Sequence, residues 1–278
     1  MSAAALPSLT ETIRRHGLAA DKRLGQHFLV DPAILARIAA AAEPLAGRTV
    51  VEIGPGPGGL TRALLASDAA RVVAVEADPR CVAALAELVQ VNAGRLEIVA
   101  GDALAVDPAG RLAGPKAIVA NLPYNIATEL IVRWLRAPAG IERIVVLVQR
   151  EVADRLAAAP GTEAYGRLSV LAQWAARVEA LFALPPGAFR PPPKVRSRVV
   201  RLTPYTTPPI PARLTTLERV TAAAFGQRRK MLRASLKRLG VDPATLCAAA
   251  HVDPSRRAET LTIAEFAALA DALDASPG

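Results

Sequence analysis

Cysteine, methionine and aromatic residues are scarce in this chain of 278 residues, and long hydrophobic runs are missing from it. Two cysteines, Cys81 and Cys247, are too few for a disulfide framework, which is typical of a reducing compartment. No run approaches the roughly 18 apolar residues that span a bilayer. Residues 1–17 also lack the basic segment and apolar core of a signal peptide. We therefore expect a cytoplasmic protein without a membrane segment.

Hydrophobic residues nevertheless make up 52% of the chain and recur in periodic segments. This composition excludes a disordered or fibrous protein. A chain of this length buries roughly 70–75% of its unfolded surface on folding. The core therefore needs no metal or disulfide, and we expect no metal site.

Positive charge is the chain's other marked feature, with a net charge of +9 concentrated in two acid-free runs. Five basic residues lie between Arg190 and Arg201, and six lie in a predicted helix from Phe225 to Arg238. These 11 residues exceed the whole net charge, so the rest of the chain is slightly acidic. A solvated helix face is the ordinary explanation, but the missing acids favour a phosphate backbone as partner. An anionic membrane is the weaker alternative, because no large apolar face accompanies the runs.

Short runs rich in Val, Ile and Ala alternate with helical patterns in the first 150 residues. The predicted strands are Thr49–Ile53, Arg71–Glu76, Leu96–Val99, Ala117–Ala120 and Ile144–Val148, and the predicted helices are Asp31–Leu45, Gly59–Ala66, Pro79–Val91 and Ala127–Leu135. This alternation predicts a mostly parallel, Rossmann-like α/β sheet. Two further strands, Val178–Leu184 and Arg198–Leu202, lack a crossover helix between them and predict an antiparallel pair at the sheet edge.

A proline-rich segment, residues 203–212, predicts a linker, and only helical patterns follow from Arg213. We therefore expect an α/β domain with an N-terminal arm in residues 1–205. A small all-helical domain is expected in residues 206–278.

A glycine-rich turn, Glu52 to Gly59, follows the first of these strands. Gly54, Gly56 and Gly59 have the spacing of a dinucleotide-binding turn, and Glu76 is placed to accept ribose hydroxyls. The same segment spells E-x-G-x-G-x-G, which resembles the cofactor loop of class I S-adenosylmethionine methyltransferases. The turn by itself leaves NAD, S-adenosylmethionine and a tight turn without ligand open.

Two later strand ends distinguish these alternatives. Asp102 follows the third strand, where it would accept the adenine amine of a cofactor or simply cap the next segment. The fourth strand ends in Asn121-Leu122-Pro123-Tyr124, which resembles the N/D-P-P-Y/F signature of methyltransferases that act on exocyclic amines of bases.

The residue types of this tetrapeptide suit an adenine N6 amine, whose lone pair is delocalised into the ring and is therefore a poor nucleophile. The Asn121 side-chain oxygen and the Leu122 carbonyl would accept the two N6 hydrogens, while Tyr124 would stack on the base. Pro123 stiffens the loop. Catalysis of this kind is mostly positioning, and a structural turn is the alternative.

Ten segments in this order carry a resemblance to a known family: Lys22–Leu29, Val51–Thr61, Val75–Asp78, Gly101–Asp102, Asn121–Tyr124, Val148–Ala153, Tyr165–Val170, Phe189–Ser197, Ala224–Leu232 and Arg257–Leu261. Together they resemble the bacterial ribosomal RNA adenine N6,N6-dimethyltransferases that act on small-subunit (16S) RNA. The resemblance implies transfer of four methyl groups from S-adenosylmethionine to two adjacent adenosines near the 3′ end of 16S RNA. It also implies that this happens late in small-subunit assembly, with residues 1–205 catalytic and residues 206–278 binding RNA. We expect a monomer.

Site residues follow from the same resemblance. The resemblance places cofactor contacts on His27, Leu29, Gly54, Glu76, Asp102 and Asn121, and we expect Gln26 and Gly56 beside them to contribute as well. It also implies that the C-terminal basic run contacts RNA, and from the two basic runs we expect RNA contacts at Arg190, Lys194, Arg228, Arg229, Lys230 and Arg233. A second base-stacking aromatic falls on Phe189, expected like Tyr124 in a proline-rich loop. His27 departs from the family, since many members have Asn there. Its imidazole would still donate to the cofactor carboxylate, or it is a loop histidine without a ligand.

Three other functions stay open. A non-catalytic assembly or RNA-binding factor that keeps the fold is disfavoured by the intact Asn121–Tyr124 tetrapeptide. A large-subunit adenine methyltransferase of the erythromycin-resistance type is disfavoured by the segment Phe225–Leu232. An NAD oxidoreductase is disfavoured because this sequence shows no His/Lys/Tyr set placed for hydride transfer.

Overall fold

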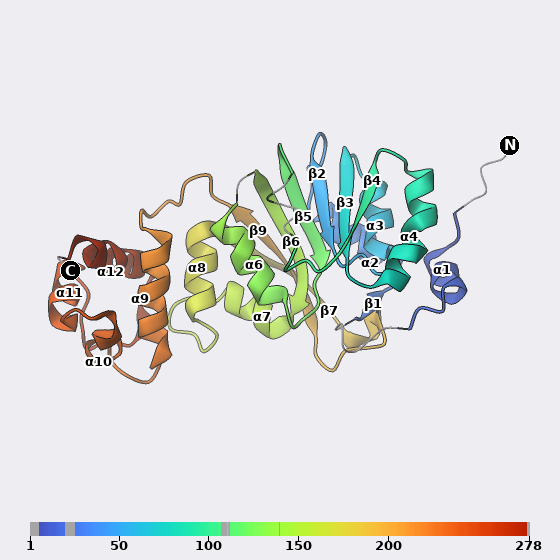
Figure 1. The fold of residues 1–278 in the computed structure, drawn as a ribbon. Helices are drawn as coiled ribbons and strands as arrows, with labels where there is room; N and C mark the ends of the chain where they lie inside the picture. The colour runs from blue at the N-terminus through green and yellow to red at the C-terminus, as the bar shows by residue number, and fades with distance from the viewer. Residues whose placement is uncertain (1–5, 20–25, 107–109, 111, 139, 277–278) are drawn as a thin grey trace. The chain divides into compact units, whose positions relative to one another are not determined.

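The computed structural model describes residues 6–19, 26–106, 110, 112–138 and 140–276, and the chain forms two compact units (Figure 1). The first unit comprises Met1–Ala153 and Glu179–Pro204, and the second comprises Asp154–Val178 and Tyr205–Gly278. The boundary after Pro204 lies beside the predicted division at residue 205, while residues 154–178 join the second unit. The motif residues 22–25 lie outside the described residues.

A seven-stranded sheet forms the centre of the fold, in the order β4-β3-β2-β5-β6-β9-β7. Its strands are β2 (Thr49–Ile53), β3 (Arg71–Glu76), β4 (Leu96–Ala100), β5 (Lys116–Asn121), β6 (Ile141–Gln149), β7 (Ala176–Leu184) and β9 (Ser197–Pro204). The five strands β2 to β6 are parallel, and β9 is antiparallel to β6. The mostly parallel Rossmann-like sheet is therefore confirmed, with β9 and β7 side by side at one edge.

The register of the strands brings the candidate site together. Ile53 is paired with Val75 on β3 and with Ala120 on β5. The next residue along the chain is Gly54 after Ile53, Glu76 after Val75 and Asn121 after Ala120. Three residues that are far apart in the sequence therefore meet at the carboxyl edge of the sheet, where open α/β sheets bind ligands.

Helices of the first unit follow the strands as predicted, with two differences. They are α1 (Leu9–Arg15), α2 (Pro32–Ala40), α3 (Gly59–Leu65), α4 (Pro79–Val91) and α6 (Ala127–Arg136), and α7 (Arg150–Leu156) begins in this unit. The predicted helix Asp31–Leu45 ends at Ala40, because Pro44 cannot continue it. Helix α1 lies in the N-terminal arm, where no helix was predicted.

The core of the first unit is built from alternate strand residues. Val50, Val72, Val119 and Leu147 belong to one hydrophobic cluster with side chains of α2, α3 and α4. Intervening residues such as Val51 are buried as well. Burial on both faces explains why the strands are nearly continuous apolar runs rather than alternating ones.

A two-stranded sheet that the sequence did not predict fastens the N-terminal arm. Strand β1 (Phe28–Leu29) pairs antiparallel with β8 (Phe189–Arg190), which follows the short helix η2 (Pro186–Ala188). Phe28 is paired with Arg190, and Leu29 with Phe189. The arm and the first basic run are therefore neighbours.

The second unit is helical. It contains α8 (Arg167–Ala175), α9 (Leu214–Gly226), α10 (Leu232–Ser235), η3 (Leu236–Leu239), α11 (Pro243–Ala249), η4 (Ala258–Thr260) and α12 (Ile263–Ala275). The ring of Phe225 lies 6.0 Å from Tyr165 and 5.4 Å from Phe266, within the core of this unit. The small helical C-terminal part of the predicted fold is thus present.

The predicted helix from Phe225 to Arg238 is wrong in one respect, because α9 ends at Gly226 and the chain turns before α10. The Lys230 N–H donates to the Gln227 carbonyl in that turn. Glycine at a helix end favours such a break. Among the described residues, no helix combines the length and apolar character needed to cross a bilayer.

Candidate cofactor and base site

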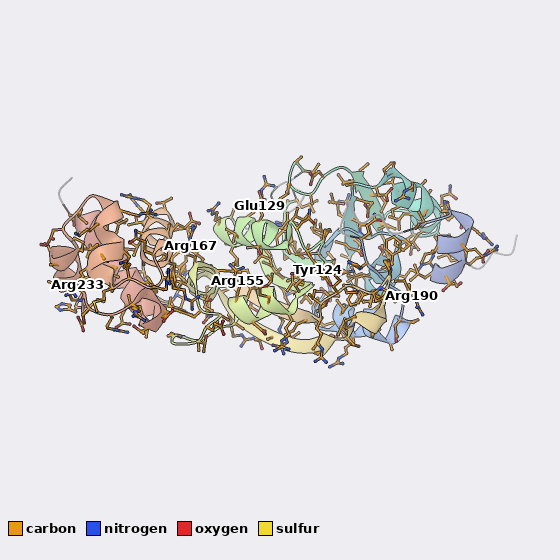
Figure 2. The ribbon with its side chains drawn as sticks, turned by 90° about the horizontal axis from the view of Figure 1, so that it is seen from below. Tyr124, Glu129, Arg155, Arg167, Arg190 and Arg233 are labelled. Atoms are coloured by element: carbon orange, nitrogen blue, oxygen red, sulfur yellow. The ribbon has the colours of Figure 1, made fainter. Side chains whose placement is uncertain are left out.

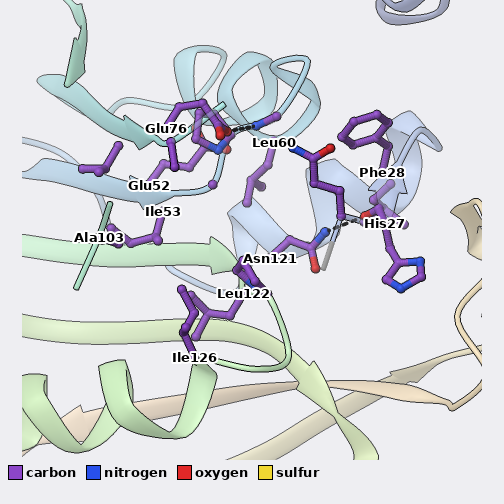
Figure 3. A pocket seen from close by; sticks show the side chains of 18 of the residues that line it. His27, Phe28, Glu52, Ile53, Leu60, Glu76, Ala103, Asn121, Leu122 and Ile126 are labelled. Carbon is purple, nitrogen blue, oxygen red and sulfur yellow. Dashed lines mark hydrogen bonds between the residues drawn. The ribbon is translucent and has the colours of Figure 1, made fainter. Parts of the chain in front are cut away.

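A cavity of about 230 Å³ opens at the carboxyl edge of the sheet in the first unit (Figure 3). Its walls come from the N-terminal arm, the turn after β2 and the ends of β3, β4 and β5. All the sequence-predicted cofactor residues and the tetrapeptide line it: Gln26, His27, Leu29, Gly54, Gly56, Glu76, Asp102, Asn121, Leu122, Pro123 and Tyr124. Within the described residues, no group of three or more His, Cys, Asp or Glu could hold a metal ion.

The glycine-rich turn is packed against the protein's own arm. Gly54 and Gly56 have φ angles of +67° and +55°, a left-handed conformation that favours glycine. A Cβ on Gly56 would lie 3.3 Å from the Phe28 ring, and one on Gly59 would lie 3.0 Å from the Leu29 carbonyl oxygen. A dinucleotide would need its pyrophosphate close to this turn. Because the arm fills that space, the geometry disfavours the NAD alternative.

Glu76 places a buried carboxylate in the cavity wall at the end of β3. One of its oxygens accepts the Gly56 N–H at 2.9 Å, and the other accepts the Asp78 N–H at 2.8 Å. Burial raises the pKa of Glu76, while these two backbone donors act in the opposite direction. Each oxygen accepts one of these two bonds and retains acceptor capacity for a ligand hydroxyl.

The other acid at the sheet edge, Asp102, is exposed. Its Oδ1 accepts the Leu104 N–H at 2.9 Å, so the predicted capping role is present. The Leu104 carbonyl in turn accepts a bond of 2.5 Å from Arg133 on α6. The loop that carries Asp102 is therefore tied to the helix beside it.

The side-chain amide of Asn121 is oriented by the N-terminal arm. Its Nδ2 donates to the His27 carbonyl oxygen at 3.1 Å (Figure 3). The amide donor is therefore used within the protein, and Oδ1 is the atom left to accept from a ligand amine. Leu122 is buried, and its N–H donates to the Leu147 carbonyl, which holds the tetrapeptide on β6.

Tyr124 is fixed by contacts with its hydroxyl and with its ring. The hydroxyl lies 2.7 Å from Ser197 Oγ, and the ring stacks on His27 with centroids 5.7 Å apart. Burial raises the pKa of Tyr124, so the phenol stays protonated at neutral pH. No local sequence signal indicated Ser197, which lies 73 residues further along the chain.

The His27 side chain lies beside the tetrapeptide. Its Nδ1 lies 2.9 Å from the Pro191 carbonyl oxygen, which can only accept, so this nitrogen carries a hydrogen. A neutral imidazole has one N–H donor, and Pro191 uses it. The Pro191 carbonyl therefore occupies Nδ1, and the predicted donation from His27 to a cofactor carboxylate stays a prediction for the other ring nitrogen.

Glu52 is a cavity residue to which no role was assigned, although it begins the E-x-G-x-G-x-G motif. It is 1% exposed, and neither carboxyl oxygen makes a hydrogen bond with the described part of the chain. Burial raises the pKa of Glu52 to about 8; the nearby Thr61 opposes this shift and the charge of Glu76 adds to it. An acid within a continuous apolar strand was the available signal.

Phe189 requires a correction. The ring is 1% exposed and belongs to the core cluster, in β8 rather than in an open loop. It is not among the residues that line the cavity. Its proline-rich neighbourhood was misleading, because pairing of Leu29 with Phe189 buries the ring. Stacking on a base is not supported for this conformation.

The predicted RNA-binding residues divide between the two units. Arg190 and Lys194 are exposed in the first unit (Figure 2 labels Arg190), and the exposed members in the second unit are Arg229, Lys230 and Arg233. Arg228 differs from them. Its Nε donates to Glu259 at 2.8 Å and its Nη2 to the Glu163 carbonyl at 2.7 Å. Its guanidinium is therefore engaged inside the second unit, contrary to a free RNA-contacting role.

Comparison with known proteins shows the family of this chain. The family model described as ribosomal RNA adenine dimethylase matches residues 17–275. A ribosomal RNA small subunit methyltransferase A from Rhodospirillum rubrum is 58% identical over 98% of this chain and 94% of its own length. A protein of the same name from Gluconobacter oxydans is 55% identical over 96% of this chain and 87% of its own length.

Solved structures show the same fold. A dimethyladenosine transferase from Plasmodium falciparum has a TM-score of 0.72 at 26% identity, covering 87% of this chain and 96% of that protein. The 23S rRNA methyltransferase ErmE has a TM-score of 0.69 at 30% identity, covering 89% of this chain and 99% of that protein. The fold is thus the class I methyltransferase fold, and the methyl donor is S-adenosylmethionine. The tetrapeptide at the end of β5, the cavity around it and the match over nearly the whole length agree, and the chain belongs to the ribosomal RNA adenine dimethylase family.

Proposed function

We propose that this protein transfers methyl groups from S-adenosylmethionine to the N6 amines of two adjacent adenosines near the 3′ end of 16S ribosomal RNA. The product would be N6,N6-dimethyladenosine at both positions. The observation that carries the proposal is the oriented Asn121 amide, held in one cavity with Glu76 and the glycine turn. We expect the substrate to be an immature small subunit, which places the reaction in the cytoplasm, and the protein to act as a monomer.

The cavity suits S-adenosylmethionine because its polar groups match the two ends of an adenosine. Glu76 offers both carboxylate oxygens to the ribose hydroxyls, and Asp102 offers an acceptor for the adenine amine. Between them the wall is apolar, formed by residues such as Val75, Ala103 and Ile126. When bound, S-adenosylmethionine supplies an electrophilic methyl group on a sulfonium.

The tetrapeptide prepares the substrate amine. Asn121 Oδ1 and the Leu122 carbonyl accept the two N6 hydrogens, which draws the nitrogen lone pair out of the ring system. Both acceptors are held before the base arrives, the first by the His27 carbonyl and the second by the bond from the Leu122 N–H to Leu147 on β6. The reaction needs no strong base at the amine, since the N6 proton can leave after the methyl group has arrived. Preorganised acceptors of this kind cost no rearrangement during the reaction.

Tyr124 holds the target base. Its ring is fixed by Ser197 and covered on one side by His27, so the base stacks on the opposite face. Stacking contributes roughly 1–3 kcal/mol per base and offsets part of the cost of extruding the adenine. Phe189 takes no part in this conformation.

The exposed basic residues supply the attraction to RNA. Arg190 and Lys194 lie on the unit that carries the cavity, while Arg229, Lys230 and Arg233 lie on the helical unit. Contacts of this type neutralise phosphates and carry no sequence information. Arg228 is a positioning residue inside the helical unit.

Incubation of undermethylated small subunits with labelled S-adenosylmethionine tests the proposal. We expect label in N6,N6-dimethyladenosine with the wild-type protein and none with Asn121→Ala. The likeness to ErmE supports one second candidate, methylation of large-subunit RNA. Label that appears only in large subunits would favour that candidate, and unlabelled RNA of both subunits would contradict the proposed enzyme.

A further inference from the structure

Asp78 lies at the centre of a hydrogen-bond network directly behind the Glu76 carboxylate, and it is not one of the predicted site residues. It is 2% exposed and follows β3 by two residues, at the N-terminus of α4. Its backbone N–H donates to Glu76 Oε1 at 2.8 Å. The Asp78 main chain therefore fixes one of the two oxygens that we assign to the cofactor ribose.

The Asp78 side chain joins three parts of the first unit. Oδ1 accepts the Arg80 N–H at 3.0 Å, which caps α4, and also the Arg80 Nε at 3.0 Å. Oδ2 accepts Arg80 Nη2 at 2.6 Å and Gln26 Nε2 at 3.0 Å. Gln26 lies on the N-terminal arm immediately before His27, whose carbonyl holds Asn121. One carboxylate thus links the end of β3, the start of α4 and the arm.

Another aspartate that caps a helix serves as an internal standard. Asp31 caps α2 as Asp78 caps α4, and each is followed by a proline at the first helical position. Asp31 is exposed, and among the residues that the structure describes it accepts only the N–H groups of Ala33 and Ile34. Helix capping therefore does not account for all the contacts of Asp78. Asp78 is also buried, accepts two bonds from the Arg80 guanidinium and accepts one from Gln26 on the arm. Electrostatics agree, because the Arg80 guanidinium and then Gln26 lower the pKa of Asp78.

We propose that Asp78 is a positioning residue for the cofactor site: it locks the N-terminal arm, through Gln26, to the strand end that carries Glu76. The inference rests on the proposed function, since it assigns S-adenosylmethionine to this cavity. It also goes further, because the arm carries both Gln26 and the His27 carbonyl that orients Asn121. Loosening the lock therefore affects the position of the Glu76 carboxylate and the orientation of the Asn121 amide together.

Asp78→Asn tests the lock and spares the cap. Asparagine caps helices as well as aspartate does, so Oδ1 still accepts the Arg80 N–H. Its Nδ2, however, is a donor that faces the donors of Gln26 and Arg80. We expect the affinity for S-adenosylmethionine in calorimetry to fall about tenfold, the effect of losing a hydrogen bond to a charged group. The matched variant Asp31→Asn should change it less than about twofold.

Exchanging the donor and the acceptor between positions 26 and 78 should restore the cofactor affinity that the single variants lose. Gln26→Glu by itself sets two carboxylates against each other and should weaken binding. Combined with Asp78→Asn, it restores a donor opposite an acceptor. We expect the double variant to bind S-adenosylmethionine more tightly than either single variant. In the cofactor-free protein, hydrogen exchange of the Gly56 and Asp78 amides should be faster in Asp78→Asn and recover in the double variant.

These outcomes separate the lock from the proposed function. If wild-type protein does not bind S-adenosylmethionine, the proposed function fails, and the exchange measurement still tests the lock. If wild-type protein binds it but Asp78→Asn matches Asp31→Asn in both affinity and exchange, the lock is overturned. A double variant no better than the singles also overturns it. Should Asp78→Asn not fold, Gln26→Leu removes the same bond away from the helix cap, and unchanged exchange at Asp78 would contradict the proposal.

Discussion

The cavity of the first unit and the turn after α9 in the second unit use charge in opposite ways. Glu76 and Asp78 are buried, and backbone donors or a guanidinium hold their carboxylates. Arg229 and Lys230 are exposed in a run that contains no acid. Buried, fixed charges define geometry, whereas exposed charges of one sign attract a polyanion in a salt-dependent way. Selectivity for the amine and attraction to the RNA should therefore be separable by mutation.

Asn121→Ala should give the largest difference between the loss of catalysis and the loss of RNA binding. The variant removes the acceptor that we assign to the N6 amine, and we expect kcat to fall by about 10²–10³, the typical effect of losing a preorganised partner of the reacting group. RNA affinity, measured by filter binding, should stay within about twofold because no phosphate contact is lost. Equal losses in kcat and RNA affinity would contradict the assignment.

Substitution of Glu76 should produce the next largest effect, on the cofactor alone. Glu76→Gln replaces one acceptor oxygen with an amide donor that opposes the Gly56 or the Asp78 N–H. We expect the affinity for S-adenosylmethionine to fall by about 10–100-fold in calorimetry, the range for hydrogen bonds to a charged group. The control is Glu97→Gln on β4, which is exposed and lies outside the cavity. A similar loss in the control would mean that the effect is not local.

Reversing two charges in the basic turn should weaken RNA binding and leave the cofactor alone. For Arg229→Glu with Lys230→Glu, we expect about a tenfold loss of subunit affinity at 0.1 M salt and a shallower salt dependence. Arg213→Glu with Arg219→Glu makes the same charge change on exposed residues outside the turn. If both pairs lose affinity equally, net charge and not the turn attracts RNA. Loss of cofactor affinity would contradict the division of roles.

The smallest effect concerns the buried carboxyl group of Glu52. Its pKa is about 8 in the folded chain against an ordinary value of 4.5, so folding retains a proton on it between these values. The free energy of unfolding should therefore fall as the pH rises from about 4.5 to about 8. We expect Tm to be about 2–6 °C lower at pH 8.5 than at pH 6. Glu52→Gln should remove most of this difference, and an unchanged difference would mean that other groups cause it.

Local sequence patterns were sufficient for most of the sheet. Runs of Val, Ile and Ala located β2 and β3 to the residue, because strands buried on both faces are continuous apolar segments. The strand-end residues Glu76 and Asn121 followed from the rule that parallel strands end at one edge. Each of these inferences used residues that are close together in the sequence.

Features made by distant segments could not be predicted in this way. Burial of Phe189 depends on pairing with Leu29, and the orientation of Tyr124 depends on Ser197. The local sequence does not distinguish Arg228 from its basic neighbours, because the Glu259 carboxylate that it contacts lies 31 residues further along the chain. A residue type reveals the chemistry that a side chain offers, whereas the fold decides which partner uses it.

Mass-spectrometric mapping of ribosomal RNA after incubation with the purified protein and S-adenosylmethionine tests the central claim most directly. We predict N6,N6-dimethyladenosine at two adjacent adenosines near the 3′ end of 16S RNA, and none at these positions with Asn121→Ala. Modification of large-subunit RNA alone, or modification that persists in Asn121→Ala, would contradict the account.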